Sequence, residues 1–187
     1  MFIQTEQTPN PQSLKFLPGC EVMISGTAEF TSPEAAVISP LAEKLFHVHG
    51  VLAVFLGSDF ITVTKTEDMS WPALKPLILG VIMEQFTSGA PVMKDEHLHQ
   101  AMPSSTVSSD DSEIVKQIKE LLDSRIRPVV AMDGGDIVFH SFEDGVVFLS
   151  MRGACAGCPS STATLKSGIE NLLKHFIPEV AEVRAVN

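Results

Sequence analysis

The sequence predicts an α+β fold, with two small two-layer domains joined by a flexible linker. In both halves of the chain, some segments alternate apolar with polar residues and others repeat apolar residues at helical spacing. Residues 88–111 are rich in Ser, Pro, Gly, Asp and His and lack a hydrophobic period, which is typical of a linker. A chain of 187 residues suits one large domain or two small ones, and a linker at this place favours two. We therefore expect domains at 1–87 and 112–187, with the linker at 88–111.

The first domain begins with short strand-like segments and a helix. Turn residues separate three extended candidates, at residues 1–8, 14–17 and 21–25. Ser39 offers an N-cap side chain, and Pro40 suits the first position of a helix. Gly50 is expected to end that helix.

A hairpin and a second helix complete the first domain. Residues 51–56 and 60–65 flank the turn residues 57–59, which is a hairpin pattern. The next helix has one apolar face, formed by Trp71, Leu74, Leu77, Ile78, Val81, Ile82 and Phe86. Pro76 either kinks the first turns of this helix or marks its start. The domain contains few groups suited to catalysis, so we expect it to recognise partners or to modulate the activity of the other domain.

The second domain is predicted to have the element order αββαβ. Its first helix should be capped near Asp111 or Ser112, and Pro178 should end its second. The apolar residues at helical spacing are Ile114, Ile118, Leu121 and Leu122 in the first helix, and Leu165, Ile169, Leu172, Leu173 and Phe176 in the second. The strands are expected at residues 137–142, 146–152 and 180–186. In this arrangement two helices cover one face of a small sheet.

Composition and charge exclude several classes of partner. The formal net charge is -10 and no cluster of Lys and Arg offsets it, so we expect no nucleic acid partner. No apolar run reaches the roughly 20 residues that cross a bilayer, and the first residues lack a signal core, so we expect a soluble protein with no membrane partner. Only 3 cysteines occur, unevenly spaced, which favours a reducing compartment over a disulfide framework.

The clearest chemical signal is the run GACAGCPSS at residues 153–161, between a predicted strand and a predicted helix. The thiolates of Cys155 and Cys158 would be favoured by the partial positive charge of the helix N-terminus. Their two-residue spacing lets both sulfur atoms converge, while Gly153 and Gly157 allow the backbone to approach an inorganic group. We therefore predict that Cys155 and Cys158 bind a metal or a metal cluster.

The number of thiolates indicates a shared site but leaves its chemistry open. Cubane clusters and tetrahedral zinc sites commonly take four protein ligands, and two chains with two thiolates each would supply four. A symmetric dimer with a surface site on its two-fold axis is expected. Two alternatives remain: a thiol-disulfide oxidoreductase that uses the Cys155/Cys158 pair, and a zinc-bridged structural dimer. The predicted hairpin before the motif argues against the oxidoreductase, because a thioredoxin-like fold has a βαβ unit there.

Several motifs resemble one family. DGGD at 133–136, FEDG at 142–145 and CAGCPSS at 155–161 resemble the C-terminal domain of NifU-like (Nfu) proteins at matching intervals. TPNPQSLKFLPG at 8–19 resembles the signature of the N-terminal domain of the longer Nfu proteins. The resemblance covers nearly the whole chain, in the order that the family has.

The resemblance implies a function that is not enzymatic. Nfu proteins assemble or relay a [4Fe–4S] cluster, and the motif cysteines, here Cys155 and Cys158, are its ligands between two chains. The expected partners are a second copy of the chain when the cluster is bound, the upstream assembly machinery and apo iron–sulfur recipient proteins. The expected compartment is the cytoplasm, if the source is bacterial, or the mitochondrial matrix, if the protein is organellar and processed.

Other residues with chemical potential are expected to play lesser roles. Cys20 matches no ligand of the family and is expected to be a bystander. Asp133 and Asp136 are expected to shape a turn rather than to transfer protons. Arg127 and Arg152 could balance the negative charge of a thiolate-bound cluster or could be ordinary solvated arginines.

Two His-X-His pairs also occur. His47 and His49 lie at a predicted helix end, and His97 and His99 lie in the predicted linker. Because no cysteine or carboxylate set converges on either pair in the sequence, we do not expect them to bind metal.

Overall fold

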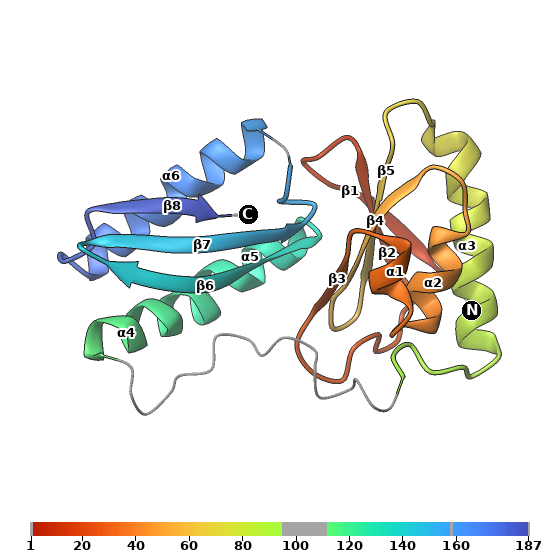
Figure 1. Cartoon of the computed structure of the whole chain (residues 1–187), viewed down its shortest axis with the longest axis horizontal. Helices are drawn as coiled ribbons and strands as arrows, with labels where there is room; N and C mark the ends of the chain where they lie inside the picture. The colour runs from red at the N-terminus through yellow and green to blue at the C-terminus, as the bar shows by residue number, and fades with distance from the viewer. Residues whose placement is uncertain (1, 95–111, 158, 187) are drawn as a thin grey trace. The chain divides into compact units, whose positions relative to one another are not determined.

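We describe a computed structural model of the chain, covering residues 2–94, 112–157 and 159–186. The chain divides into two compact units, Met1–Pro103 and Ser104–Asn187 (Figure 1). The protein is α+β, as the sequence predicts. Most of the predicted linker, residues 95–111, lies outside the described residues, so its bounds remain a prediction.

The first unit is a five-stranded antiparallel sheet with helices on one side. Along the sheet the strand order is β1-β2-β5-β4-β3, which places β1 and β3 at the edges. In Figure 1, α2 and α3 lie on the same side of this sheet. The strands are β1 (Gln4–Gln7), β2 (Ser13–Leu17), β3 (Ala28–Phe30), β4 (Val51–Leu56) and β5 (Ile61–Lys65), and the helices are α1 (Pro33–Ala36), α2 (Pro40–Phe46) and α3 (Trp71–Thr87).

The start of α2 follows the predicted capping chemistry. Ser39 Oγ accepts a hydrogen bond from Ala42 N at 3.1 Å, and Pro40 occupies the first turn. The same hydroxyl donates to Val92 O at 2.6 Å. Residue Met93 is only 2% exposed. The chain after α3 therefore packs against the first unit as far as this point, although the sequence assigns it to the linker.

The prediction of a strand at residues 21–25 is wrong. Val22 N and Met23 N both donate to Ser58 O, at 2.7 and 3.2 Å, in the turn between β4 and β5. This segment is consequently fixed by a turn carbonyl rather than by a neighbouring strand. The third strand lies later, at Ala28–Phe30, where it pairs with β4.

Helix α3 begins at Trp71, so Pro76 lies inside the helix and does not mark its start. Its buried face is formed by Leu74, Ile78 and Ile82, all fully buried at a spacing of four residues. Leu77 is 57% exposed and does not belong to this face, contrary to the prediction. The apolar pattern alone did not resolve which side of the helix faces the sheet, because the exposed side is apolar as well.

The second unit has the predicted order αββαβ. Its sheet runs β6-β7-β8, with β6 and β7 antiparallel and β7 and β8 parallel. The first helix of the second unit contains a π-helical segment just before Pro128. Proline has no backbone N–H, so the regular α-helical hydrogen bond cannot form at this position. The elements are α4 (Glu113–Leu121), the π-helical segment (Leu122–Ile126), α5 (Arg127–Met132), β6 (Gly135–Glu143), β7 (Val146–Gly153), α6 (Pro159–Phe176) and β8 (Glu182–Val186).

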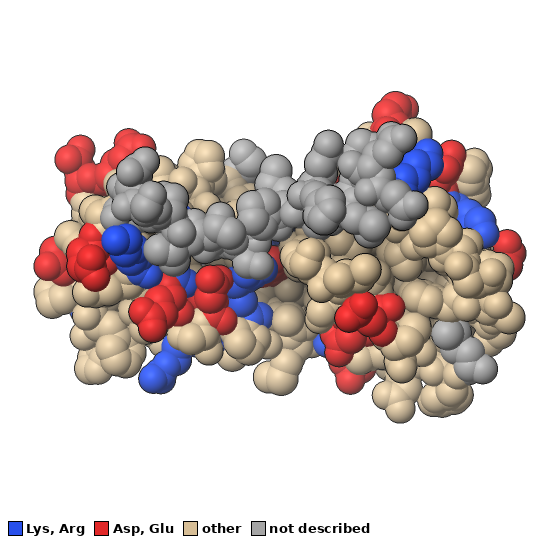
Figure 2. All heavy atoms as spheres, turned by 90° about the horizontal axis from the view of Figure 1, so that it is seen from below, with Lys and Arg blue, Asp and Glu red and all other residues tan. Residues whose placement is uncertain are grey.

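One core joins both helical segments of the second unit to one face of its sheet. Because side chains alternate across a strand, Val147 and Leu149 of β7 share a face, and both are fully buried. The same cluster contains Ile118, Leu122, Ile126, Val130, Ile137, Ile169, Leu173, Ile177, Val180, Val183 and Cys155. On the surface that carries α4 and α5, acidic and basic side chains lie next to one another (Figure 2).

Over the described residues, we find no helix that combines the length and the apolar character needed to span a membrane.

Candidate metal centre

Cys155 of the cysteine motif lies in the loop between β7 and α6, as predicted. Strand β7 ends at Gly153 and α6 begins at Pro159, with Cys155 between them. Gly153 and Gly157 have φ values of 64° and 73°, in the left-handed region that favours glycine. Cys158 precedes Pro159 in the chain and lies outside the described residues.

The thiol of Cys155 is buried, whereas the sequence led us to expect a site near the surface. Cys155 is 6% exposed and belongs to the hydrophobic core of the second unit. Its position depends on Gly135, the first residue of β6. A Cβ atom at Gly135 would lie 2.6 Å from Cys155 Sγ and 2.6 Å from Arg152 O, which is closer than atoms approach. The glycine therefore leaves the space that the sulfur occupies.

Backbone and side-chain hydrogen bonds hold the loop on both sides of Cys155. Ala154 N donates to Gly134 O at 3.2 Å, which ties the loop to the segment before β6. Ala156 N donates to Gly153 O at 3.1 Å and closes a tight turn. Thr162 Oγ1 donates to Cys155 O at 3.2 Å, which connects the loop to the first turns of α6. The cysteine backbone is thus attached to both neighbouring elements.

A buried ion pair fixes the DGGD segment that supports the loop. Asp136 is 4% exposed, and its carboxylate accepts hydrogen bonds from Arg127 Nε at 2.8 Å and Nη2 at 2.7 Å. Ile137 N also donates to Asp136 Oδ1 at 2.8 Å. This bidentate pair joins α5 to the start of β6. Asp136 therefore has a structural role, as expected, and Asp133 caps the C-terminus of α5.

The charge of Arg127 is used within the unit. Its Nη1 also donates to Asp123 Oδ1 at 3.2 Å. The hydrogen bond to Asp136 is the main reason that the pKa of Arg127 lies above its ordinary value. Two carboxylates balance this cation, so Arg127 does not serve as the counter-charge of a cluster in this structure. The sequence did not predict the ion pair between Arg127 and Asp136. The spacing of four residues between Asp123 and Arg127 does suggest the weaker ion pair of the same arginine.

The remaining candidates do not join the motif. Cys20 is exposed and belongs to the first unit, and His47 caps the C-terminus of α2. His97 and His99 lie outside the described residues. Among the residues that the structure describes, there is no group of three or more His, Cys, Asp and Glu side chains that could hold a metal ion.

Comparisons with known proteins match both units. Residues 3–89 match the family described as "Scaffold protein Nfu/NifU N terminal", and residues 118–184 match "NifU-like domain". A solved structure, the solution structure of a NifU-like protein from Saccharomyces cerevisiae, covers 51% of this chain and 86% of its own, with 28% identity and a TM-score of 0.46.

Curated relatives align along the whole chain. The "NFU1 iron-sulfur cluster scaffold homolog, mitochondrial" of Drosophila persimilis is 56% identical over 189 residues, which cover 100% of this chain and 65% of the relative. The human protein of the same name is 52% identical over 188 residues, which cover 100% of this chain and 72% of the human protein. "NifU-like protein 4, mitochondrial" of Arabidopsis thaliana is 52% identical over 98% of this chain and 65% of its own length. The chain belongs to the Nfu/NifU family.

Proposed function

We propose that this protein is an iron–sulfur cluster scaffold and carrier. Its cargo is a [4Fe–4S] cluster held by Cys155 and Cys158 of two chains, which is then delivered to apo-proteins. The names of the relatives support the scaffold role. This chain spans 65% of the Drosophila persimilis relative, so the activity of that whole protein enters here as part of the proposal.

The observation that carries the proposal is the place of Cys155, on a short glycine-bounded loop that leads into α6. A thiolate at a helix N-terminus is stabilised by unpaired backbone N–H groups and by the helix dipole. The three hydrogen bonds around Cys155 fix its backbone, which limits the ordering that ligand binding requires. Helix α6, of 18 residues, begins at Pro159, four positions after Cys155.

The burial of Cys155 gives the proposal a specific step. With its side chain in the core, Sγ is not accessible to a cluster shared with a second chain. Loading therefore includes an outward rotation of the Cys155 side chain, while the three hydrogen bonds hold its backbone in place. Release of the cluster to three or four cysteines of a recipient is an exchange of thiolate ligands, so no catalytic base is needed.

The two alternatives predict a different metal content. An oxidoreductase would use the same thiols without metal, and a zinc dimer would hold zinc in four thiolates. The antiparallel pairing of β6 and β7 before the loop does not match the βαβ unit of a thioredoxin-like protein.

The decisive experiment is anaerobic reconstitution with ferrous iron, sulfide and a thiol reductant. We expect a brown protein with equal iron and sulfide. Cys155→Ser and Cys158→Ser should abolish stable binding, and Cys20→Ser, the matched control in the first unit, should retain it. A colourless protein, zinc in place of iron, or equal loss in the Cys20 variant would contradict the proposal.

Delivery is tested separately. The loaded protein is mixed with an apo-protein that needs a [4Fe–4S] cluster, in the presence of an iron chelator. We expect activation faster than with equivalent free iron and sulfide. Activation that the chelator abolishes would identify a store rather than a carrier.

The names of the relatives also suggest a compartment. Three relatives at 52–56% identity are named mitochondrial. We infer the mitochondrial matrix for this protein. Immunodetection in fractionated cells is expected to find it with matrix markers, and a purely cytosolic distribution would contradict the inference.

A further inference from the structure

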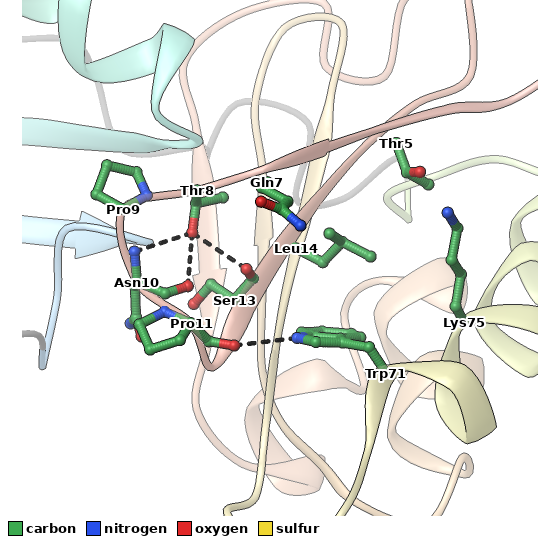
Figure 3. Close-up of a pocket in the computed structure, with 10 residues that line it drawn as sticks. All are labelled: Thr5, Gln7, Thr8, Pro9, Asn10, Pro11, Ser13, Leu14, Trp71 and Lys75. Atoms are coloured by element: carbon green, nitrogen blue, oxygen red, sulfur yellow. Dashed lines mark hydrogen bonds between the residues drawn. The ribbon is translucent and has the colours of Figure 1, made fainter.

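The first unit contains a pocket that the cluster site does not involve. The cavity of about 510 Å³ lies between the edge strand β1, the loop that follows it and the first turns of α3. Figure 3 shows Trp71 and Lys75 of α3 facing Thr5 and Gln7 of β1 across it. The floor is the TPNP segment, the same run that marks the N-terminal domain of the family.

Internal hydrogen bonds build the floor of the pocket. Thr8 Oγ1 donates to Asn10 O at 2.8 Å and accepts from Asn10 N at 3.2 Å. Asn10 Oδ1 accepts from Gln12 N at 3.0 Å. Trp71 Nε1 donates to Pro11 O at 3.0 Å, which fixes the indole as one wall. The pocket is therefore preorganised and does not depend on a ligand for its shape.

The pocket carries a positive charge, although the net charge of the protein is -10. Lys75 is the one charged residue among those that line it, and its side chain extends from α3 toward Thr5 in Figure 3. In the described part of the chain, Lys75 forms no ion pair. Outside the pocket lining, Lys65 Nζ lies 5.9 Å from the ring centroid of Trp71 and donates to Gln12 Oε1 at 2.6 Å. A half-buried ammonium that forms no ion pair, beside the indole of Trp71, fits a carboxylate.

The strand beside the pocket can accept another strand. β1 pairs with β2 on one side, and no described strand pairs with its other side. The outer edge of such a strand presents backbone N–H and C=O groups, which extended peptides use for binding. Thr5 and Gln7 share one face of β1 because side chains alternate, so every second side chain of an added strand would face the pocket.

We propose that the first unit binds an extended acidic peptide segment of a partner protein. The segment adds to the outer edge of β1, and a carboxylate of the segment pairs with Lys75 beside Trp71. The binding is independent of the cluster, since no residue of the second unit takes part. It gives the first unit a recognition role that is distinct from cluster binding.

The single tryptophan of the chain makes the proposal measurable, because its emission reports only this pocket. A displayed library of random seven-residue peptides is selected on the full-length protein, and enriched peptides are synthesised and titrated while Trp71 emission is followed. We expect enriched peptides to carry Asp or Glu and to shift the emission saturably. Replacing that acid by its amide should weaken binding at least about fivefold, the loss of roughly one screened ion pair.

Variants of the protein separate the pocket from general charge effects. Lys75→Gln should weaken the selected peptides about as much as loss of the peptide carboxylate. Lys94→Gln, which removes an exposed lysine of the same unit outside the pocket, should bind as the parent does. In an added strand, only every second residue donates its backbone N–H to β1. N-methylation of that set of peptide nitrogens should abolish binding, and N-methylation of the other set should not. The proposal would be overturned if no peptide were enriched or if the enriched peptides lacked Asp and Glu. Equal affinity of the selected peptides for the parent and the Lys75→Gln protein would overturn it as well.

Discussion

A Cβ atom at Gly135 would lie 2.6 Å from Cys155 Sγ, so the first residue of β6 determines where the motif thiol can rest. This contact joins the DGGD and CAGC motifs, which lie far apart in the sequence. It explains in physical terms why a glycine occurs at the start of this strand. The same contact is the basis of the first prediction.

Gly135→Ala should destabilise the second unit, because the added methyl displaces the thiol or the carbonyl of Arg152. Overpacking of this kind costs about 1–3 kcal/mol. Thermal unfolding and the reaction rate of Cys155 with a thiol reagent measure the two effects, and the rate should rise. Gly168→Ala is the control, since a Cβ there meets nothing within 4 Å and alanine favours a helix. Equal unfolding of both variants would contradict the contact.

The buried ion pair makes a second prediction. Asp136→Asn leaves the Arg127 cation half-buried with its main partner neutral, and breaking such a pair costs about 3–5 kcal/mol. Asp123→Asn removes the more exposed partner of the same arginine and should cost less than about 1 kcal/mol. Urea unfolding followed by circular dichroism measures both. A loss at position 123 as large as that at 136 would show that the two carboxylates share the cation equally.

The register of α3 can be tested with two leucines of the same helix. Leu74 is fully buried and Leu77 is 57% exposed. Leu74→Ala should cost about 2–5 kcal/mol of unfolding free energy, because it leaves a cavity under the sheet. Leu77→Ala should change stability by no more than about 0.5 kcal/mol. Similar losses at both positions would mean that the helix is rotated from the orientation described.

A carboxylate of α6 predicts a pH dependence. Glu170 accepts hydrogen bonds from Lys174 Nζ at 2.7 Å and from Val183 N at 3.0 Å, which joins α6 to β8. The hydrogen bond from Lys174 is the main cause that lowers the pKa of Glu170 below 4.5. A lowered folded-state pKa means that the stabilisation is present above the unfolded value and is lost as the pH falls through the folded value.

The test compares Glu170→Gln with the parent protein across pH. The parent should be more stable at neutral pH, and the difference should shrink from about pH 4.5 downward and vanish in stronger acid. A stability difference that does not change with pH would assign the effect to packing rather than to the charge.

Local sequence signals predicted much of the fold. Ser39 and Ser112 cap helices with side-chain hydrogen bonds, as their positions before helical patterns indicate. The hairpins and the order αββαβ also follow from patterns within short segments. Each of these depends on neighbours a few residues apart, which the sequence displays directly.

The features that were missed depend on contacts between distant segments. The bonding of residues 22 and 23 to Ser58 O prevents a strand that local pattern suggests. The burial of Cys155 depends on the space above Gly135, which no spacing rule reveals. The bidentate pair of Arg127 and Asp136 likewise requires the turn of the chain between α5 and β6.

Native mass spectrometry of the anaerobically reconstituted full-length chain tests the central claim most directly, because it gives oligomeric state and metal content together. We predict a dimer, at twice the 20.2 kDa of one chain, that carries four iron and four sulfide. Protein without iron should not form this species, and Cys155→Ser protein should not form it under the same conditions. A complete cluster on a single chain, or a dimer that holds zinc and no sulfide, would contradict the account.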